Sequence, residues 1–392
     1  MAAMLFAVPA ARGEQQLGGI GFSGSGFLTM AVGKVIKGDM PQDFNGYSAP
    51  MYVADYAQGG IYEHNGWTIK PDSKLGFQGT MTVNPRFSAT AQVVSRGTKS
   101  GGLNLEWAYG SYVINDKLTF QFGRKRLPLF YYSETQDVGL TYPWIHLPPG
   151  QYGWEIVNYN GANMLYRDQW GEWTSSMNFF AGDETRKDNP YQKIYNGRFT
   201  RTDSKWSNIR GVDMTLTHDW FEARAAYIQS GTQDRFEDPE TGPPFEFSPK
   251  AKQKIYSLSF SADHRNWVVI NEYLYLSRKQ VGDEFFSVLL GVGYRMGKYL
   301  PMVTYNRYRE RLTPGDADPS VTDPATIDPK AHEGFWTLGY SLRYSLTPTS
   351  AIKVELDRWY DQNGPNFNIG AGGSTVPYGN ARLFSVSYDM VF

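Results

Sequence analysis

Apolar and polar residues alternate along many short segments of the chain. Along 335–346, one face of an extended segment is apolar or aromatic and consists of Trp336, Leu338, Tyr340, Leu342, Tyr344 and Leu346. In the next segment, 351–360, aliphatic residues alternate with Lys353, Glu355 and Asp357. A period of two predicts β-strands with one apolar and one polar face. Three charges on one face cannot lie unpaired in a protein core, whereas they can line water.

The same alternation predicts about sixteen strands and few helices. Each strand is close to the ~9–11 residues that cross a bilayer as a tilted β-strand. The predicted strands are 20–33, 74–83, 87–96, 103–113, 117–126, 161–167, 173–181, 208–217, 220–229, 254–262, 267–277, 285–296, 299–308, 335–346, 351–360 and 382–392.

The connections between these strands alternate between short and long. The short ones are 84–86, 114–116, 168–172, 218–220, 263–266, 297–298 and 347–350. The long ones are 34–73, 127–160, 182–207, 230–253, 309–334 and 361–381, and two others, 97–102 and 278–284, are of intermediate length. Short turns on one side and long loops on the other are typical of an outer-membrane barrel. We therefore predict an all-β fold, an antiparallel up-and-down transmembrane barrel in a Gram-negative outer membrane.

The last strand ends on an aromatic residue, which is unusual for a chain terminus. Every second residue of this segment is apolar, namely Phe384, Val386, Tyr388, Met390 and Phe392. In lipid an open sheet edge would leave backbone groups unpaired, so the last strand must close the sheet against the first. The alternation resembles the C-terminal signal that the barrel-insertion machinery recognises in bacterial outer-membrane proteins.

From about residue 20 to its end, the chain resembles Gram-negative porins of the sixteen-stranded general-diffusion type. The resemblance depends on the number of strands, the alternation of short and long loops, and the terminal Phe. It also depends on strand–turn segments such as LTFQFGRKRLPL, DWFEARAAYIQS and YSLTPTSAIKVELDR. It implies one barrel domain over 14–392, a homotrimer, and outer-membrane lipid and lipopolysaccharide as surroundings. It also implies a water-filled channel for passive diffusion of small hydrophilic solutes, with the third long loop folded into the pore.

The third long connection, 127–160, has the composition expected of such a loop. It is rich in Pro, Tyr and Trp, and a freely solvated loop would not need so much apolar area. Its acids Glu134 and Asp137, with Lys125 and Arg126 at its start, are the predicted constriction residues. The ordinary alternative is that these acids are solvated loop residues. A bulge near GRKRLP would exchange the direction of Lys125 with that of its arginine neighbours.

Charged residues on the inward face of several strands are candidates for the pore wall. They are Arg224, Glu272, Arg295, Arg343, Lys353, Glu355 and Asp357. Rings of charged side chains tune ion selectivity. We expect the loop acids to face Arg295, Arg343 and Lys353 across the pore, although for any single residue the simpler interpretation is that it keeps the lumen wet.

Composition removes several other classes of function. The formal net charge of -1 provides no basic field for nucleic acid. Cysteine is absent, and the five histidines show no paired spacing typical of a zinc site, so we predict no metal and no cofactor. No catalytic motif indicates an enzyme. Residues 1–13 contain an apolar stretch followed by small residues, which we interpret as the remnant of a signal peptide.

A barrel used mainly for interaction is the alternative function. It could act as a surface receptor or adhesin, or as a sheath for a periplasmic partner. A sheath should be wide and should lack an inward third loop, whereas a receptor should stay active when its pore is blocked.

Overall fold

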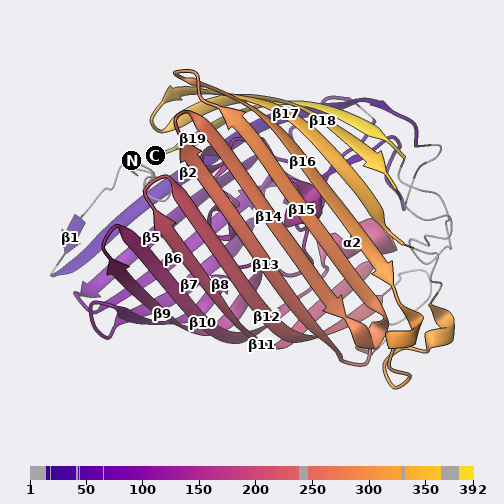
Figure 1. The fold of residues 1–392 in the computed structure, drawn as a ribbon, viewed down its shortest axis with the longest axis horizontal. Helices are drawn as coiled ribbons and strands as arrows, with labels where there is room; N and C mark the ends of the chain where they lie inside the picture. Colours follow the sequence, from indigo (N-terminus) through magenta and orange to yellow (C-terminus); the bar gives the residue numbers. More distant parts are fainter. Residues whose placement is uncertain are drawn as a thin grey trace.

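The computed structural model describes residues 15–17, 19–40, 43, 45–64, 66–237, 246–327, 332–362 and 379–392. In this part of the chain, sixteen long strands form a closed antiparallel barrel in which each strand pairs with its neighbours in sequence. The predicted signal remnant, 1–13, lies outside the described residues. Figure 1 shows the strands running obliquely around the barrel, with the short turns at one end and α2 at the other.

The barrel strands are β2 (Ile20–Gly38), β5 (Lys74–Asn84), β6 (Phe87–Arg96), β7 (Leu103–Val113), β8 (Leu118–Arg126), β9 (Asn158–Trp170), β10 (Trp173–Arg186), β11 (Arg201–His218), β12 (Phe221–Glu237), β13 (Ala251–His264), β14 (Trp267–Arg278), β15 (Asp283–Tyr294), β16 (Tyr299–Leu312), β17 (Gly334–Thr347), β18 (Ser350–Asp361) and β19 (Ala381–Val391). The smaller elements include β1 (Gln15–Leu17), β3 (Tyr52–Asp55), β4 (Gly60–Tyr62), α1 (Pro149–Tyr152) and α2 (Pro190–Asn196).

Each predicted segment coincides with one barrel strand, so the predicted fold class is confirmed. The main difference is length, because several strands continue into the long connections. For example, β11 starts at Arg201 rather than at residue 208, and β12 continues to Glu237. Backbone pairing continues there, but the register shifts between Ser207 and Arg210. A bulge of this kind interrupts the alternation from which strands are predicted.

The last strand closes the barrel against the first. β19 pairs antiparallel with β2, which removes both edges of the sheet. The backbone N–H of Phe392 donates to the carbonyl of Gly26 at 2.9 Å. The Phe392 ring lies over Gly26, where an added Cβ would come within 2.4 Å of it, and meets Phe77 edge-on. Gly26 therefore leaves room for the terminal aromatic ring at this position.

Replacing Phe392 by alanine should weaken this closure. We expect a loss of about 1–3 kcal/mol in the free energy of unfolding, because the ring contacts with Gly26 and Phe77 disappear. Urea unfolding of the barrel in detergent micelles measures this loss. Phe199→Ala is the matched control, since Phe199 is 79% exposed on an external loop. Equal midpoints for the two variants would contradict the proposed closure role.

The outer face of the barrel carries an apolar band. Its exposed members include Phe77, Phe122, Leu258, Val292, Val303, Leu342, Ile352 and Val354. Aromatic side chains gather near the short turns, and they include Trp170, Trp220, Trp267, Tyr294 and Tyr299. A band of this extent would be unfavourable in water, whereas lipid with an aromatic belt at its interface accommodates it.

No helix in the described part of the chain is long and apolar enough to span a membrane.

Candidate functional site

The third long connection, residues 127–157 and hereafter the third loop, folds into the lumen between β8 and β9. Its large aromatic side chains are each exposed by 5% or less, and they are Phe130, Tyr131, Tyr132, Tyr142, Trp144, Tyr152 and Trp154. They belong to one apolar cluster with inward residues of β11 to β15, namely Ile209, Ile228, Ile255, Leu276 and Leu289. The predicted inward loop is confirmed, and apolar side chains of β11 to β15 form part of the barrel wall beneath it.

Most of the predicted wall charges bind the third loop. The carboxylate of Glu272 accepts hydrogen bonds from the Tyr131 backbone N–H at 3.0 Å and from the Tyr152 hydroxyl. The ammonium of Lys353 donates to the carbonyl of Gly139 at 2.6 Å and lies 3.1 Å from Asp389. These charges therefore satisfy loop groups that would otherwise be buried without partners.

Three more predicted wall residues, on β17 and β18, also contact the third loop. Arg343 donates to the carbonyl of Leu140 at 2.7 Å, and Glu355 accepts from the backbone N–H of Ile145 at 2.5 Å. Asp357 lies next to His146, with 3.6 Å between its Oδ2 and the imidazole Nε2. β17 and β18 thus hold the part of the loop that follows Gly139.

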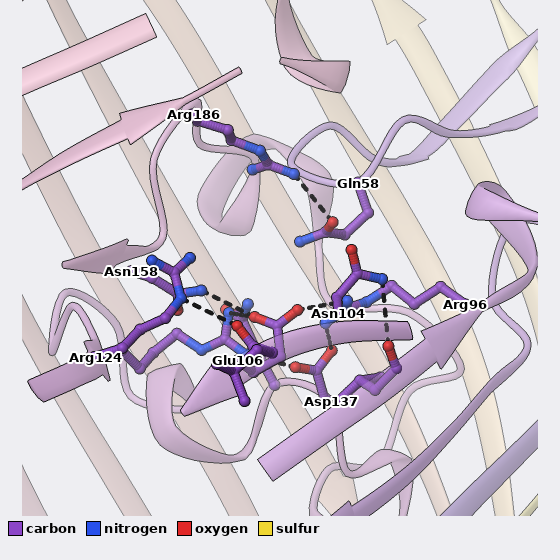
Figure 2. Close-up of polar contacts among 12 residues, drawn as sticks. Gln58, Arg96, Asn104, Glu106, Arg124, Asp137, Asn158 and Arg186 are labelled. Atoms are coloured by element: carbon purple, nitrogen blue, oxygen red, sulfur yellow. Dashed lines mark hydrogen bonds and ion pairs between the residues drawn. The ribbon is translucent and has the colours of Figure 1, made fainter. Parts of the chain in front are cut away.

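A closed ring of four charged side chains holds the start of the third loop, and Figure 2 labels three of them, Arg96, Glu106 and Asp137. Arg96 bridges Glu106 at 2.6 Å and Asp137 at 2.7 Å. Arg126 bridges the same two acids, at 3.3 Å to Glu106 and 2.5 Å to Asp137. Asn158 donates a further hydrogen bond to Glu106 at 2.9 Å. The ring has no net charge, and its four charged side chains are buried.

These arginines also determine the ionisation of Asp137. Burial alone would raise the pKa of its carboxyl group, but Arg96 and Arg126 lower that pKa well below its usual range. Asp137 is therefore ionised and fully paired. It contributes no unpaired charge to the lumen.

Glu134 differs from Asp137 because it remains accessible. Its carboxylate pairs with Arg224 at 3.0 Å, yet 42% of its side chain is exposed. Burial raises the pKa of Glu134, and the neighbouring Arg224 more than offsets this effect, so that its pKa lies below the usual value. Arg224 also lies 3.5 Å from Asp213 of β11.

The remaining predicted residues, Lys125 and Arg295, have hydrogen-bond or ion-pair partners outside the third loop. The ammonium of Lys125 donates to Gln121 and, at 3.1 Å, to Asn163. Arg295 pairs with Asp263 at 2.5 Å beside the short turns, because β15 ends at Tyr294. The expectation that the loop acids face Arg295, Arg343 and Lys353 is therefore corrected. Their partners are Arg224, Arg96 and Arg126.

An open space of about 380 Å³, lined by both polar and apolar side chains, lies between the third loop and the opposite wall. The loop side includes Glu134, Thr135 and Thr141. The wall side belongs mainly to β2, β5, β6 and β7, and its polar members are Ser23, Ser25, Gln78, Thr80 and Gln92. Glu134 is the ionisable residue among those that line this space. One carboxylate therefore borders this space.

Residues 45–64 and 66–73 of the first long loop also lie inward, which the strand and loop pattern alone does not predict. Tyr52, Tyr56 and Tyr62 of this loop are almost fully buried, and Tyr56 packs near Tyr191 of α2. The hydroxyl of Tyr62 donates to Asp72 at 2.7 Å. Its dense tyrosines are the same signal that predicts an inward third loop, so composition could have indicated both.

Comparison with known proteins gives a likeness of fold. The sequence matches no known family profile, and no curated protein sequence matches it. OmpT, an outer membrane protein of Vibrio cholerae, matches with a TM-score of 0.56 and 10% identity, over 97% of this chain and 100% of its own. An anion-selective porin from Comamonas acidovorans has a TM-score of 0.53 and 12% identity, over 95% of this chain and 100% of its own.

Salmonella typhi OmpF, solved in complex with daunomycin, has a TM-score of 0.53 and 13% identity, over 97% of this chain and 100% of its own. The chain therefore has the sixteen-stranded fold of these outer-membrane barrels. The fold, together with the apolar outer band, indicates the outer membrane of a Gram-negative bacterium.

Proposed function

We propose that this protein is a passive channel for small hydrophilic solutes across the outer membrane. The observation that carries the proposal is the open space between the third loop and the wall of β2 to β7, whose lining includes hydroxyl, amide and carboxylate groups. A space lined by hydroxyl, amide and carboxylate groups favours hydrated solutes over apolar ones. The porin-like fold of the solved neighbours supports the same function.

Glu134 is the residue that we propose to set ion preference. Asp137 is neutralised within the four-residue ring, whereas Glu134 retains an exposed carboxylate beside the passage. Arg224 interacts with Glu134, Asp213 and Glu222, and Lys125 interacts with the first two of these acids, so the group carries an excess of one negative charge. A weak preference for cations follows.

The proposed assembly is a homotrimer. A trimer form of Vibrio cholerae OmpT, with the same overall fold, supports it. The apolar band provides a surface for neighbouring barrels as well as for lipid. The inward third loop argues against the alternative role as a sheath, since a sheath needs an unobstructed lumen.

Replacing Glu134 by glutamine tests the channel and its ion preference together. Under a salt gradient in a planar bilayer, the parent protein should give discrete conductance steps and a reversal potential of the cation-selective sign. Loss of the exposed carboxylate should move that potential towards the anion-selective side by several millivolts, with conductance retained.

Glu172→Gln is the matched control, because Glu172 lies in a short turn and its side chain is 87% exposed. This variant should keep the reversal potential of the parent. Inserted protein without conductance would reject the channel and leave a receptor role. Conductance with the same potential in both variants would reject the role of Glu134 alone.

A further inference from the structure

A histidine and two carboxylates meet where the third loop reaches β18. His146 belongs to the loop, and Glu355 and Asp357 lie on the inward face of the strand. One ligand atom from each of the three lies within 4.8 Å of the others. All three side chains are buried, with residue exposures of 5% or less.

Besides the Nδ1 of His146, two atoms of this cluster have no hydrogen-bond partner among the residues that the structure describes. They are the Nε2 of His146 and the Oδ2 of Asp357, and 3.6 Å separates them. Buried polar atoms are rarely left without a partner, so two that face each other point to a ligand bound between them. Glu355 uses its Oε2 for the loop backbone, which leaves Oε1 available.

The far side of the imidazole has the surroundings of a metal ligand. Oδ2 of Asp72 lies 3.3 Å from the Nδ1 of His146, and the Tyr62 hydroxyl donates to the same oxygen. A carboxylate on the second ring nitrogen is a common feature of metal-binding histidines, because it orients the ring and makes it a stronger ligand.

Charge favours a cation at this position. Three carboxylates, those of Asp72, Glu355 and Asp357, surround one imidazole. The two neighbouring lysines have other partners. Lys353 contacts Asp389 and two loop carbonyls, and Lys74 contacts Tyr142 and the carbonyl of Gln136.

We propose that His146, Glu355 and Asp357 bind a divalent transition-metal ion of the zinc type. One nitrogen and two carboxylate oxygens are ligands that such ions accept, and water completes the shell. With bonds of ~2.0–2.2 Å, neighbouring ligand atoms around zinc are ~3–3.5 Å apart, close to the observed His146–Asp357 separation. A small polar cavity of about 30 Å³, lined by Asp72 and His146, adjoins the site.

Such an ion would connect three separate parts of the chain. Its ligands come from the third loop and β18, and Asp72 links the first loop to it through the imidazole. Binding should therefore stabilise both inward loops against the wall. The proposal does not depend on conduction, since a barrel of any function would bind the ion in this way.

Isothermal titration of the full, detergent-folded and chelator-treated protein with zinc chloride tests the site. We expect one zinc ion per chain. His146→Gln should weaken binding at least tenfold, and Asp72→Asn should weaken it by about 10–100-fold, because Asp72 orients the ligand. His264→Gln is the matched control, since His264 is an exposed residue at the end of β13, and it should bind as the parent does.

Failure of the parent protein to bind zinc would overturn the proposal, as would equal binding by the parent and His146→Gln. In that case the imidazole acts only as the counterion of the three acids. If His146→Gln does not fold, the absorption spectrum of cobalt(II) added to the parent protein serves as the test. Ligand-field bands typical of nitrogen and carboxylate ligands would support the site. A hexa-aqua spectrum would overturn the proposal. Conductance is recorded separately, so its absence would reject the channel without affecting the metal result.

Discussion

Asp137→Ala is expected to release the start of the third loop and to raise the single-channel conductance. The substitution leaves the guanidinium groups of Arg96 and Arg126 buried around one remaining acid, Glu106. Removing one partner from a buried ion-pair network costs about 3–5 kcal/mol. That cost falls on the loop rather than on the barrel, whose strands are held by their own backbone ladders. A detached loop widens the passage and makes the current noisier.

Planar-bilayer recordings measure the conductance, and limited proteolysis locates the exposed segment. New cleavage sites should fall within 127–157. Asp188→Ala is the matched control, because Asp188 is an external-loop acid with a side chain that is 51% exposed and paired with Lys193. Identical conductance and cleavage patterns in both variants would show that the four-residue ring does not hold the loop.

Trp144→Ala should loosen the middle of the third loop. The indole is 1% exposed, its Nε1 donates to Thr304 at 2.6 Å, and its ring meets Tyr132 edge-on. Removing a buried tryptophan costs about 3–5 kcal/mol, because contacts are lost and a cavity remains. Amide hydrogen exchange across 127–157 should therefore accelerate by about two to three orders of magnitude, while the barrel strands keep their protection.

Two further substitutions serve as comparisons for the hydrogen exchange of Trp144→Ala. Trp144→Phe should accelerate exchange much less, since it keeps most of the packing and loses only the hydrogen bond to Thr304. Trp170→Ala should leave the loop unchanged, because Trp170 is 57% exposed beside a short turn. Exchange that is unaffected in Trp144→Ala would mean that the loop is held by its polar contacts alone.

The barrel could be predicted because each strand carries its own signal. Alternation reports which residues face lipid, and it operates over a few neighbouring residues, as in 335–346. The terminal Phe392 and the paired loop lengths then specify closure and orientation. The inward third loop could be predicted too, since seven large aromatic side chains need a surface on which to pack.

The partners of the charged residues could not be predicted in the same way. Glu106 and Trp107 are consecutive, yet one joins the ion-pair ring and the other lines the open space, because the register of β7 with β6 shifts there. Alternation allows only one of two consecutive residues to face inward. The cluster of His146, Glu355 and Asp357 joins positions about two hundred residues apart, and no local spacing reports such a meeting.

The side chains that hold the third loop and those that line the open space are largely different residues. The third loop depends on apolar packing and charged anchors of β11 to β18 and on the ion-pair ring of β6 to β8, whereas the proposed passage borders other residues of β2 to β7. Residues such as Ser25, Gln78 and Thr80 touch the passage without supporting the loop. In the proposed channel, selectivity can therefore drift, or be engineered for a sensing nanopore, by substitutions at such residues while the loop anchors preserve the shape of the pore.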